Sequence, residues 1–304
     1  MLRKIVFLSW TALFAVFALN FTACSDDESF IAKPQDGGKS SSSPKGTGSS
    51  SSGTPVTGCE TCEYGKLKDD RDGQTYRTVK IGDQWWMAEN LNYAYLEPTK
   101  TLDSSSFCYD NDPENCNQYG RLYLFSAAVD SAGLFSSDAE GCGYGTECPF
   151  DHIVPKIYKG YSDTASSLEQ PIRGVCPEGW HVPTVDEFVI MFESMGGKSD
   201  ENHYWEWENV DLKSTSGWRE KYNGTDSFGF SAYPAGEWSK PSNRDDPIFS
   251  SLGSAAQFFT TSTKNPSLSD DGRTYILVIW LSGNMAEFTY YWKNSAQSVR
   301  CVKD

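Results

Sequence analysis

The chain has 304 residues, of which 38% are hydrophobic and 14% aromatic, and its formal net charge is −15. This amount of apolar sequence is sufficient for one sizeable core or two small ones. A strongly acidic chain without a basic patch excludes nucleic acid as an expected partner, because phosphate binding needs clustered Lys and Arg side chains.

Residues 1–23 have the organisation of a bacterial signal peptide. Two basic residues precede the apolar run 5–19, which is shorter than the ~20 residues of a membrane-spanning helix. A retained membrane anchor is the alternative. The segment 21–24, Phe-Thr-Ala-Cys, resembles a relaxed lipobox, which implies cleavage before Cys24 and its acylation. The acidic tract 25–28 resembles the signal of lipoproteins on the outer face of the outer membrane. We therefore expect an exported, surface-exposed lipoprotein whose membrane contact is its lipid anchor.

Residues 24–58 are expected to form the lipidated N-terminus and a disordered linker. This segment is rich in Ser, Gly and Pro and carries few apolar side chains, so it cannot bury enough surface to fold. No second linker of comparable length follows. Residues 59–304 are therefore interpreted as one domain.

The first elements expected in this domain are a hairpin and a helix. The hairpin consists of strands at 76–81 and 85–87, joined by a Gly-Asp turn. The helix is predicted over 119–130, where apolar residues recur at helical spacing.

A second helix is predicted after Pro183. Thr184 and Glu187 have the spacing of a capping box, and Gly196 is a stop signal. Further strand-like runs lie at 228–233, 257–261, 274–280, 285–290 and 298–302. Two main helices with many short antiparallel strands indicate an α+β fold.

The nine cysteines agree with export. With Cys24 acylated, eight are left, and an even number in an exported protein indicates disulfides. Many pairings are possible; short spacings favour two local pairs, and a long-range pair then remains. The Cys-x-x-Cys pair suits a structural clip, with a redox or zinc half-site as the alternative. The expected pairs are Cys59–Cys62, Cys108–Cys116, Cys142–Cys148 and Cys176–Cys301.

No catalytic site, metal site or cofactor is expected. A glycosidase needs two carboxylates at a fixed separation, and the sequence cannot show such a pair. The chain has three histidines and no Gly-x-Ser-x-Gly motif. The segment 110–121 begins like an EF-hand loop but lacks Gly at its sixth position and Glu at its twelfth. A calcium site of another kind is left open.

Tryptophans are the candidate ligand-binding residues. Trp85 and Trp86 are consecutive in a predicted strand, so their side chains point to opposite faces. Trp205 and Trp207 share a face if their segment is extended. Aromatic rings beside polar groups suit sugar rings, and we select Trp85, Trp205 and Trp207. The alternative is that these aromatics are core residues. Further candidates are Trp218, Trp238, Tyr290, Tyr291 and Trp292.

Seven ordered segments strongly resemble the Fibrobacter major paralogous domain, a family of exported bacterial proteins. They are 69–82, 84–93, 119–123, 174–188, 212–218, 223–236 and 298–304. In the family motif, Trp86 is the motif residue and Trp85 fills a free position. The resemblance therefore implies that Trp86 is in the core and Trp85 points outward. It implies no particular activity.

A weaker resemblance is to C-type-lectin-like and formylglycine-generating-enzyme-like domains. It rests on the segments 181–188, 282–289 and 299–302. It implies a single disulfide-stapled domain in which Cys176 and Cys301 tie the second helix region to the last strand. The activity of the formylglycine-generating enzymes is not implied, because Cys301 has no neighbouring cysteine.

The sequence thus predicts a non-catalytic cell-surface module that binds polysaccharide or another surface component through exposed aromatics. The alternatives are an enzyme that acts on carbohydrate or exported protein, and an architectural envelope protein.

Overall fold

The computed structural model describes the domain in several ranges. They are residues 59, 61–98, 105–146, 148, 171–199, 204–206, 211–240, 246–263, 272–282 and 285–304. The expected signal peptide, Cys24 and the linker lie outside these ranges. No helix within them has the length and apolar character needed to cross a membrane.

The first antiparallel sheet has the order β1-β2-β3-β15-β6. The C-terminal strand therefore lies in the middle, between the β2–β3 hairpin and β6. The hairpin has the predicted two-residue turn, with Ile81 opposite Gln84. The strands are β1 (Tyr64–Lys68), β2 (Thr75–Ile81), β3 (Gln84–Met87), β15 (Val302–Lys303) and β6 (Trp180–His181).

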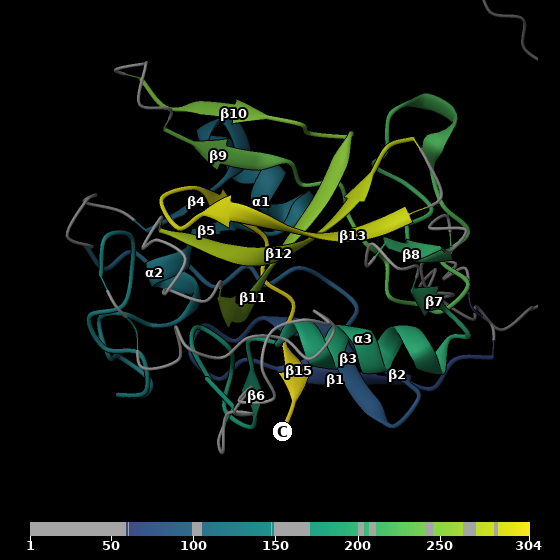
Figure 1. Ribbon diagram of the computed structural model, residues 1–304, viewed down its shortest axis with the longest axis horizontal. Helices are drawn as coiled ribbons and strands as arrows, with labels where there is room; N and C mark the ends of the chain where they lie inside the picture. The colour runs from purple at the N-terminus through teal and green to yellow at the C-terminus, as the bar shows by residue number, and fades with distance from the viewer. Residues whose placement is uncertain are drawn as a thin grey trace, which may run out of the picture. The chain divides into compact units, whose positions relative to one another are not determined.

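Two further antiparallel sheets complete the described part of the domain (Figure 1). The second sheet contains, in order, β10 (Ile248–Ser250), β9 (Glu237–Ser239), β14 (Ala296–Gln297), β5 (Leu122–Leu124) and β4 (Ser106–Phe107). The third contains, in order, β11 (Ala255–Thr263), β12 (Arg273–Trp280), β13 (Met285–Trp292), β8 (Tyr204–Glu206) and β7 (Lys198–Ser199).

The main helix follows Pro183 as predicted. The Thr184 hydroxyl accepts from the Glu187 backbone N–H, and the Glu187 carboxylate accepts from the Thr184 N–H. This capping box starts α3 (Val185–Ser194). The other helical segments among the described residues are α1 (Pro113–Tyr119), α2 (Phe125–Ala128), and the 3₁₀ turns η1 (Tyr109–Asn111) and η3 (Glu220–Tyr222).

The helix predicted over 119–130 is wrong. α1 ends at Tyr119, and Gly120 turns the chain with a φ of 76°. Leu122, Tyr123 and Leu124 form β5 and are all buried. Only one helical turn, α2, follows. A fully buried strand and a buried helix cannot be told apart by the spacing of apolar residues.

Most predicted strands are present. The runs 76–81, 85–87, 257–261, 274–280 and 285–290 fall within β2, β3, β11, β12 and β13. The strand predicted over 228–233 is wrong, because this segment makes only an isolated bridge, between Ala232 and Lys213. The run 298–302 is strand only at its end, in β15.

The third sheet is buried on both faces. Along β12, Ile276 and Val278 pack into one hydrophobic core, while Leu277 and Ile279 pack into a second core on the other face. α3 belongs to the second core and lies between β3 and β13 (Figure 1). A third, smaller cluster lies at the second sheet and includes Leu122, Leu124 and Trp238. The domain therefore has helix and sheet layers around three hydrophobic clusters, and is an α+β fold rich in strand.

Trp86 is fully buried in the second core. Its ring lies 4.8 Å from that of Phe188 and 6.1 Å from that of Phe230, measured between centroids. Trp85 lies on the opposite face of β3, as strand alternation requires, but it is half-buried against the first core. The expectation of substantial exposure is wrong, because Gly65 in β1 leaves room for the Trp85 ring: a Cβ at Gly65 would lie 3.1 Å from it.

Three disulfides hold the described part of the domain. Cys176 and Cys301 are joined with a Cα separation of 6.0 Å, and this bond ties the segment before β6 to the segment before β15. The two local bonds are Cys59–Cys62 and Cys108–Cys116. Cys142 and Cys148 both lie buried in the first core, and their pairing with each other stays a prediction.

Candidate functional site

Two exposed aromatic side chains lie together at one end of the β12–β13 ladder. Trp292 is 47% exposed and Tyr144 is 41% exposed. Their ring centroids are 6.3 Å apart, and the rings are inclined by 67°. Arg273 is the cross-strand partner of Trp292, and its guanidinium carbon lies 5.4 Å from the Trp292 ring centroid. These three residues are called the Trp292 surface below.

The local backbone explains why Tyr144 reaches this place. Gly272 has a φ of +65°, and a Cβ at this position would lie 2.8 Å from the Tyr144 ring. A larger residue would therefore push the ring away. Upstream in β13, Ala286 and Phe288 pack into the second core, whereas Trp292 lies at the end of the ladder and is exposed.

Trp280 lies at the opposite end of the same ladder and is 44% exposed. Side-chain alternation places it on the other face of the sheet from Trp292. Its indole N–H donates to the Glu287 carboxylate over 2.6 Å. Trp280 is therefore a second exposed indole, well matched to Trp292 in exposure but in a different setting.

The tryptophans selected from the sequence do not form one site in the described structure. Trp85 is half-buried in the first sheet. Trp205 lies in β8 of the third sheet, where only its backbone is described, opposite Ala286. Trp207 lies outside the described residues. Trp218 and Trp238 are core residues, at 4% and 3% exposure.

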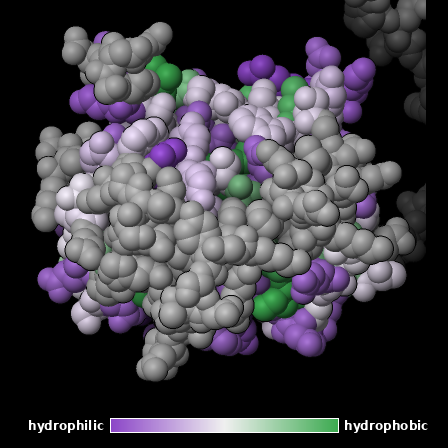
Figure 2. Space-filling view, in the orientation of Figure 1, coloured by the Kyte–Doolittle hydropathy of each residue, from purple (hydrophilic) through white to green (hydrophobic). Residues whose placement is uncertain are grey.

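Apolar side chains on the described part of one face are scattered. Figure 2 shows small, separate hydrophobic patches among hydrophilic side chains on the described part of this face. Rings that carry a polar atom, such as indole and phenol, combine apolar area with hydrogen bonding.

A polar cavity of about 190 Å³ lies where three segments meet. Its walls come from residues 74–76 at the start of β2, residues 89–92 after β3, and residues 116–120 at the end of α1, with Tyr233 beside them. No Lys, Arg or His is among the described residues that line it. The wall consists mainly of side-chain amides, tyrosines and one carboxylate, that of Glu89.

Some of these polar groups are held by the protein itself. The Asn90 amide donates to the carbonyl of Tyr119 over 2.7 Å, and its oxygen accepts from Arg300 over 2.6 Å. The Glu89 carboxylate accepts from the backbone N–H of Arg77. These bonds fix the residues that follow β3 relative to the end of α1.

Other groups in the wall have unused hydrogen-bonding capacity. The Asn92 backbone N–H donates to the Tyr76 hydroxyl over 3.0 Å. The side-chain oxygen of Asn92 is buried and accepts no hydrogen bond from the described residues. A buried acceptor without a partner is unfavourable, and a donor that reached this atom would remove that cost.

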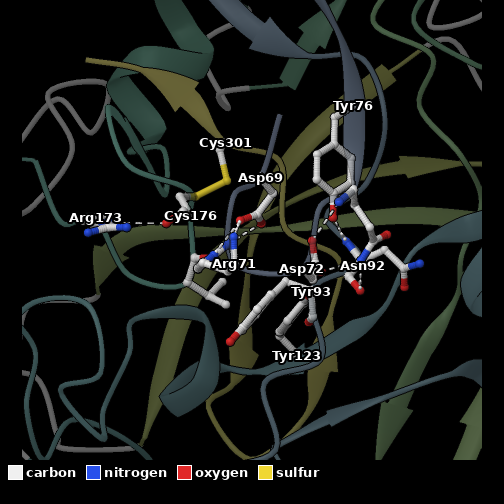
Figure 3. A network of polar contacts seen from close by, with 12 residues as sticks. Asp69, Arg71, Asp72, Tyr76, Asn92, Tyr93, Tyr123, Arg173, Cys176 and Cys301 are labelled. Carbon is white, nitrogen blue, oxygen red and sulfur yellow. Dashed lines mark hydrogen bonds and ion pairs between the residues drawn. A yellow bond between two sulfur atoms is a disulfide. The ribbon is translucent and has the colours of Figure 1, made fainter. Parts of the chain in front are cut away.

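A network around Arg71 supports this side of the cavity (Figure 3). Its guanidinium donates two hydrogen bonds to the buried Asp69 carboxylate, over 2.8 and 2.7 Å, and a third to the carbonyl of Val175. The guanidinium carbon also lies against two rings that contact each other, 4.0 Å from the Tyr93 centroid and 4.5 Å from the Phe135 centroid. The β1–β2 turn is thereby fixed next to the Cys176–Cys301 disulfide.

His181 is a buried residue held between two carboxylates. Its Nδ1 lies 2.6 Å from an Asp304 carboxylate oxygen, and its Nε2 lies 2.7 Å from a Glu187 oxygen. Both ring nitrogens are therefore hydrogen-bonded, and these bonds connect β6 with α3 and with the residue that follows β15. Burial works to lower the pKa of His181, but the bonds to Glu187 and Asp304 outweigh it, so the pKa is raised.

The raised pKa of His181 predicts a loss of stability as the pH rises. A His pKa raised above its ordinary 6.5 gives stabilisation that is complete below that value and lost as pH rises through the raised pKa. We expect the free energy of unfolding to fall more steeply for the parent than for His181→Gln between about pH 6 and 9. Parallel curves in urea titrations would contradict this. Below the ordinary Glu187 value of 4.5, the lowered pKa of Glu187 predicts a separate loss in acid.

Among the described residues, no group of three His, Cys, Asp or Glu side chains is placed to hold a metal ion. The polar networks around Arg71, His181 and Arg300 were not anticipated from the sequence. The segment 69–73 contains the Asp-x-Arg pair, but its partners Tyr93, Phe135 and Val175 are distant in the chain.

Comparison with protein families gives one match. A sequence model of the Fibrobacter succinogenes major domain matches residues 79–303. Comparisons with curated proteins and with solved structures return no significant match. The matched range runs from Val79, within β2, to β15, and it includes the Trp292 surface and most of the cavity wall.

Proposed function

The chain belongs to the Fibrobacter succinogenes major domain family, and we propose that its domain is a non-catalytic module that binds polysaccharide through the Trp292 surface. The observation that carries this proposal is the pair of adjacent exposed rings, Tyr144 and Trp292, beside the Arg273 guanidinium. Membership of the family by itself assigns no activity.

The proposal has a physical basis in the chemistry of sugars. The C–H face of a pyranose ring is apolar and packs against a flat aromatic ring, whereas its hydroxyls need hydrogen-bonding partners. Two rings inclined by 67° form a corner that can contact one sugar on its face and on its edge. The guanidinium of Arg273 supplies donors for hydroxyls.

We further propose that the module is displayed on the cell surface by acylation of Cys24. The support is the sequence pattern of residues 1–28, which precedes the described residues. A lipid anchor and a Ser/Gly/Pro linker would hold the binding surface away from the membrane, where it can reach polysaccharide.

A C-type-lectin-like character of the fold also remains part of the proposal. Its support is the Cys176–Cys301 disulfide and the α3 capping box, which agree with the segments that carry that resemblance.

Replacing Trp292 with alanine is expected to weaken polysaccharide binding about tenfold, since ~1.4 kcal/mol of lost stacking corresponds to a factor of ten. The test is native affinity electrophoresis of the full chain in gels that contain cellulose derivatives, xylan, mannan or a bacterial surface polysaccharide. Tyr144→Ala should show a smaller loss in the same direction.

Trp280→Ala is the matched control, because Trp280 is equally exposed but lies at the other end of the ladder. It should migrate like the parent in every gel. If Trp280→Ala loses retention and Trp292→Ala does not, the binding surface is misassigned. If the parent is not retained by any polysaccharide, the architectural alternative is favoured, and hydrolysis of a polysaccharide in the gel would favour the enzyme.

A further inference from the structure

We propose that the polar cavity bounded by β2, the segment after β3 and the end of α1 is a second binding site, which takes one neutral sugar unit. This site shares no residue with the Trp292 surface and does not depend on the function proposed for it. The occupant is identified by the size of the cavity, by the charge of its wall and by the hydrogen bonds that the wall leaves open.

The size of the cavity limits the ligand to a small molecule. A volume of about 190 Å³ corresponds to roughly six water molecules at ~30 Å³ each. It lies below the range of about 300–1,000 Å³ that is usual for drug-sized ligands. One sugar unit, free or as part of a glycan, has the appropriate size.

The charge of the wall argues against anionic ligands. No cationic side chain is among its described residues, so a phosphate or carboxylate would be desolvated without a counter-charge. The one carboxylate, Glu89, already accepts a hydrogen bond from the backbone of Arg77. A peptide side chain is also a poor fit, because the wall provides no apolar pocket for it.

The neutral groups match hydroxyls, which both donate and accept. Each side-chain amide supplies two donor hydrogens and a carbonyl acceptor, and the wall contains Asn92, Asn117 and Gln118. The Gln74 amide also lines the wall, but its nitrogen already donates to the Asp72 carboxylate and to the Asn92 backbone carbonyl. A ligand hydroxyl that donates to the buried Asn92 oxygen would satisfy an acceptor that the described protein leaves unpaired.

The Tyr76 hydroxyl adds a donor beside that oxygen. It already accepts from the Asn92 backbone N–H, so its proton remains available to a ligand oxygen. Burial raises the pKa of Tyr76, which keeps the phenol protonated. Tyr76 and Asn92 lie side by side in Figure 3, and together they present one donor and one acceptor.

The wall is rigid enough to recognise a small ligand. The Cys108–Cys116 disulfide fixes α1, and Cys116 itself lines the cavity. Asn90 joins the end of α1 to the segment after β3. A site formed before the ligand arrives loses little conformational entropy on binding.

Ligand-observed saturation-transfer NMR with the full chain tests this site. The probes are glucose, galactose, mannose and xylose, with glucosamine and glucuronate as charged comparators. At least one neutral sugar should bind, and Gln118→Ala, at an exposed position of the rim, should weaken that binding about fivefold or more, the loss of ~1 kcal/mol for one hydrogen bond. Asn92→Ala should weaken it further.

Trp292→Ala is the control, and it should leave binding of the monosaccharide unchanged. The proposal is overturned if no neutral sugar binds, if the charged comparators bind better, or if Trp292→Ala alone abolishes the signal. If Asn92→Ala does not fold, Gln118→Ala and Asn117→Ala still decide the outcome, because both side chains are exposed. The two sites are distinguished by retention on polysaccharide. Trp292→Ala should lose this retention, whereas Gln118→Ala should keep it.

Discussion

Trp86→Ala is expected to lower the free energy of unfolding by about 3–5 kcal/mol, because it empties a fully enclosed site in the second core. The ring is 0% exposed and packs on Phe188 of α3 and on Phe230. α3 contacts both β3 and β13, so the cavity would lie where helix and sheets meet. Urea denaturation followed by circular dichroism measures the loss.

Trp85→Ala is the control for this prediction. Trp85 has the same side chain in the same strand, but its ring is half-buried over Gly65. Its replacement should cost about 1–2 kcal/mol, in proportion to the smaller area that leaves contact. Equal losses for the two variants would contradict the assignment of the two faces of β3.

Arg300→Met is expected to cost about 3–5 kcal/mol, the usual loss when one partner of a buried charged network is removed. Arg300 is 0% exposed, and its guanidinium donates to the Asn90 side chain and to the carbonyls of Met87, Phe230 and Ser231. Methionine fills much of the volume but leaves these four acceptors without a donor.

The charge of Arg300 is also balanced at a distance. Burial lowers its pKa, and the negative charges of Glu89 and Asp226 act in the opposite direction. The matched control is Lys68→Met, which removes a cation from an exposed pair with Asp70 and should have no measurable effect. If Arg300→Met unfolds at the same urea concentration as the parent, the network does not stabilise the fold.

Local signals allowed α3 and the hairpin to be predicted from the sequence. The capping box of Thr184 and Glu187 acts within one turn, and the Gly-Asp turn acts within four residues, so both can be read without the rest of the chain. The region 119–130 has no such marker except Gly120. The spacing of its buried residues is compatible with either a strand or a helix. The pairing of β5 with β4 and β14 determines that this segment is a strand.

The candidate sites depend on contacts that are distant in the chain. Trp85 is half-buried because its ring reaches across β2 to Gly65 in β1, and Trp292 is exposed at the last pair of the β12–β13 ladder. Arg300 finds its acceptors about 70 and 210 residues upstream. The sequence contained the aromatic run that ends at Trp292, but no local pattern indicates which of its rings faces solvent.

The central claim is that the domain binds polysaccharide through the Trp292 surface, and the indole N–H resonance of Trp292 tests it most directly. Comparison of the spectrum of the parent with that of Trp292→Phe identifies the signal of Trp292. Titration with oligosaccharides of each polysaccharide that retains the protein should shift the Trp292 signal saturably and leave the signals of Trp86 and Trp280 in place. A constant Trp292 signal while the oligosaccharide shifts other resonances would contradict the claim.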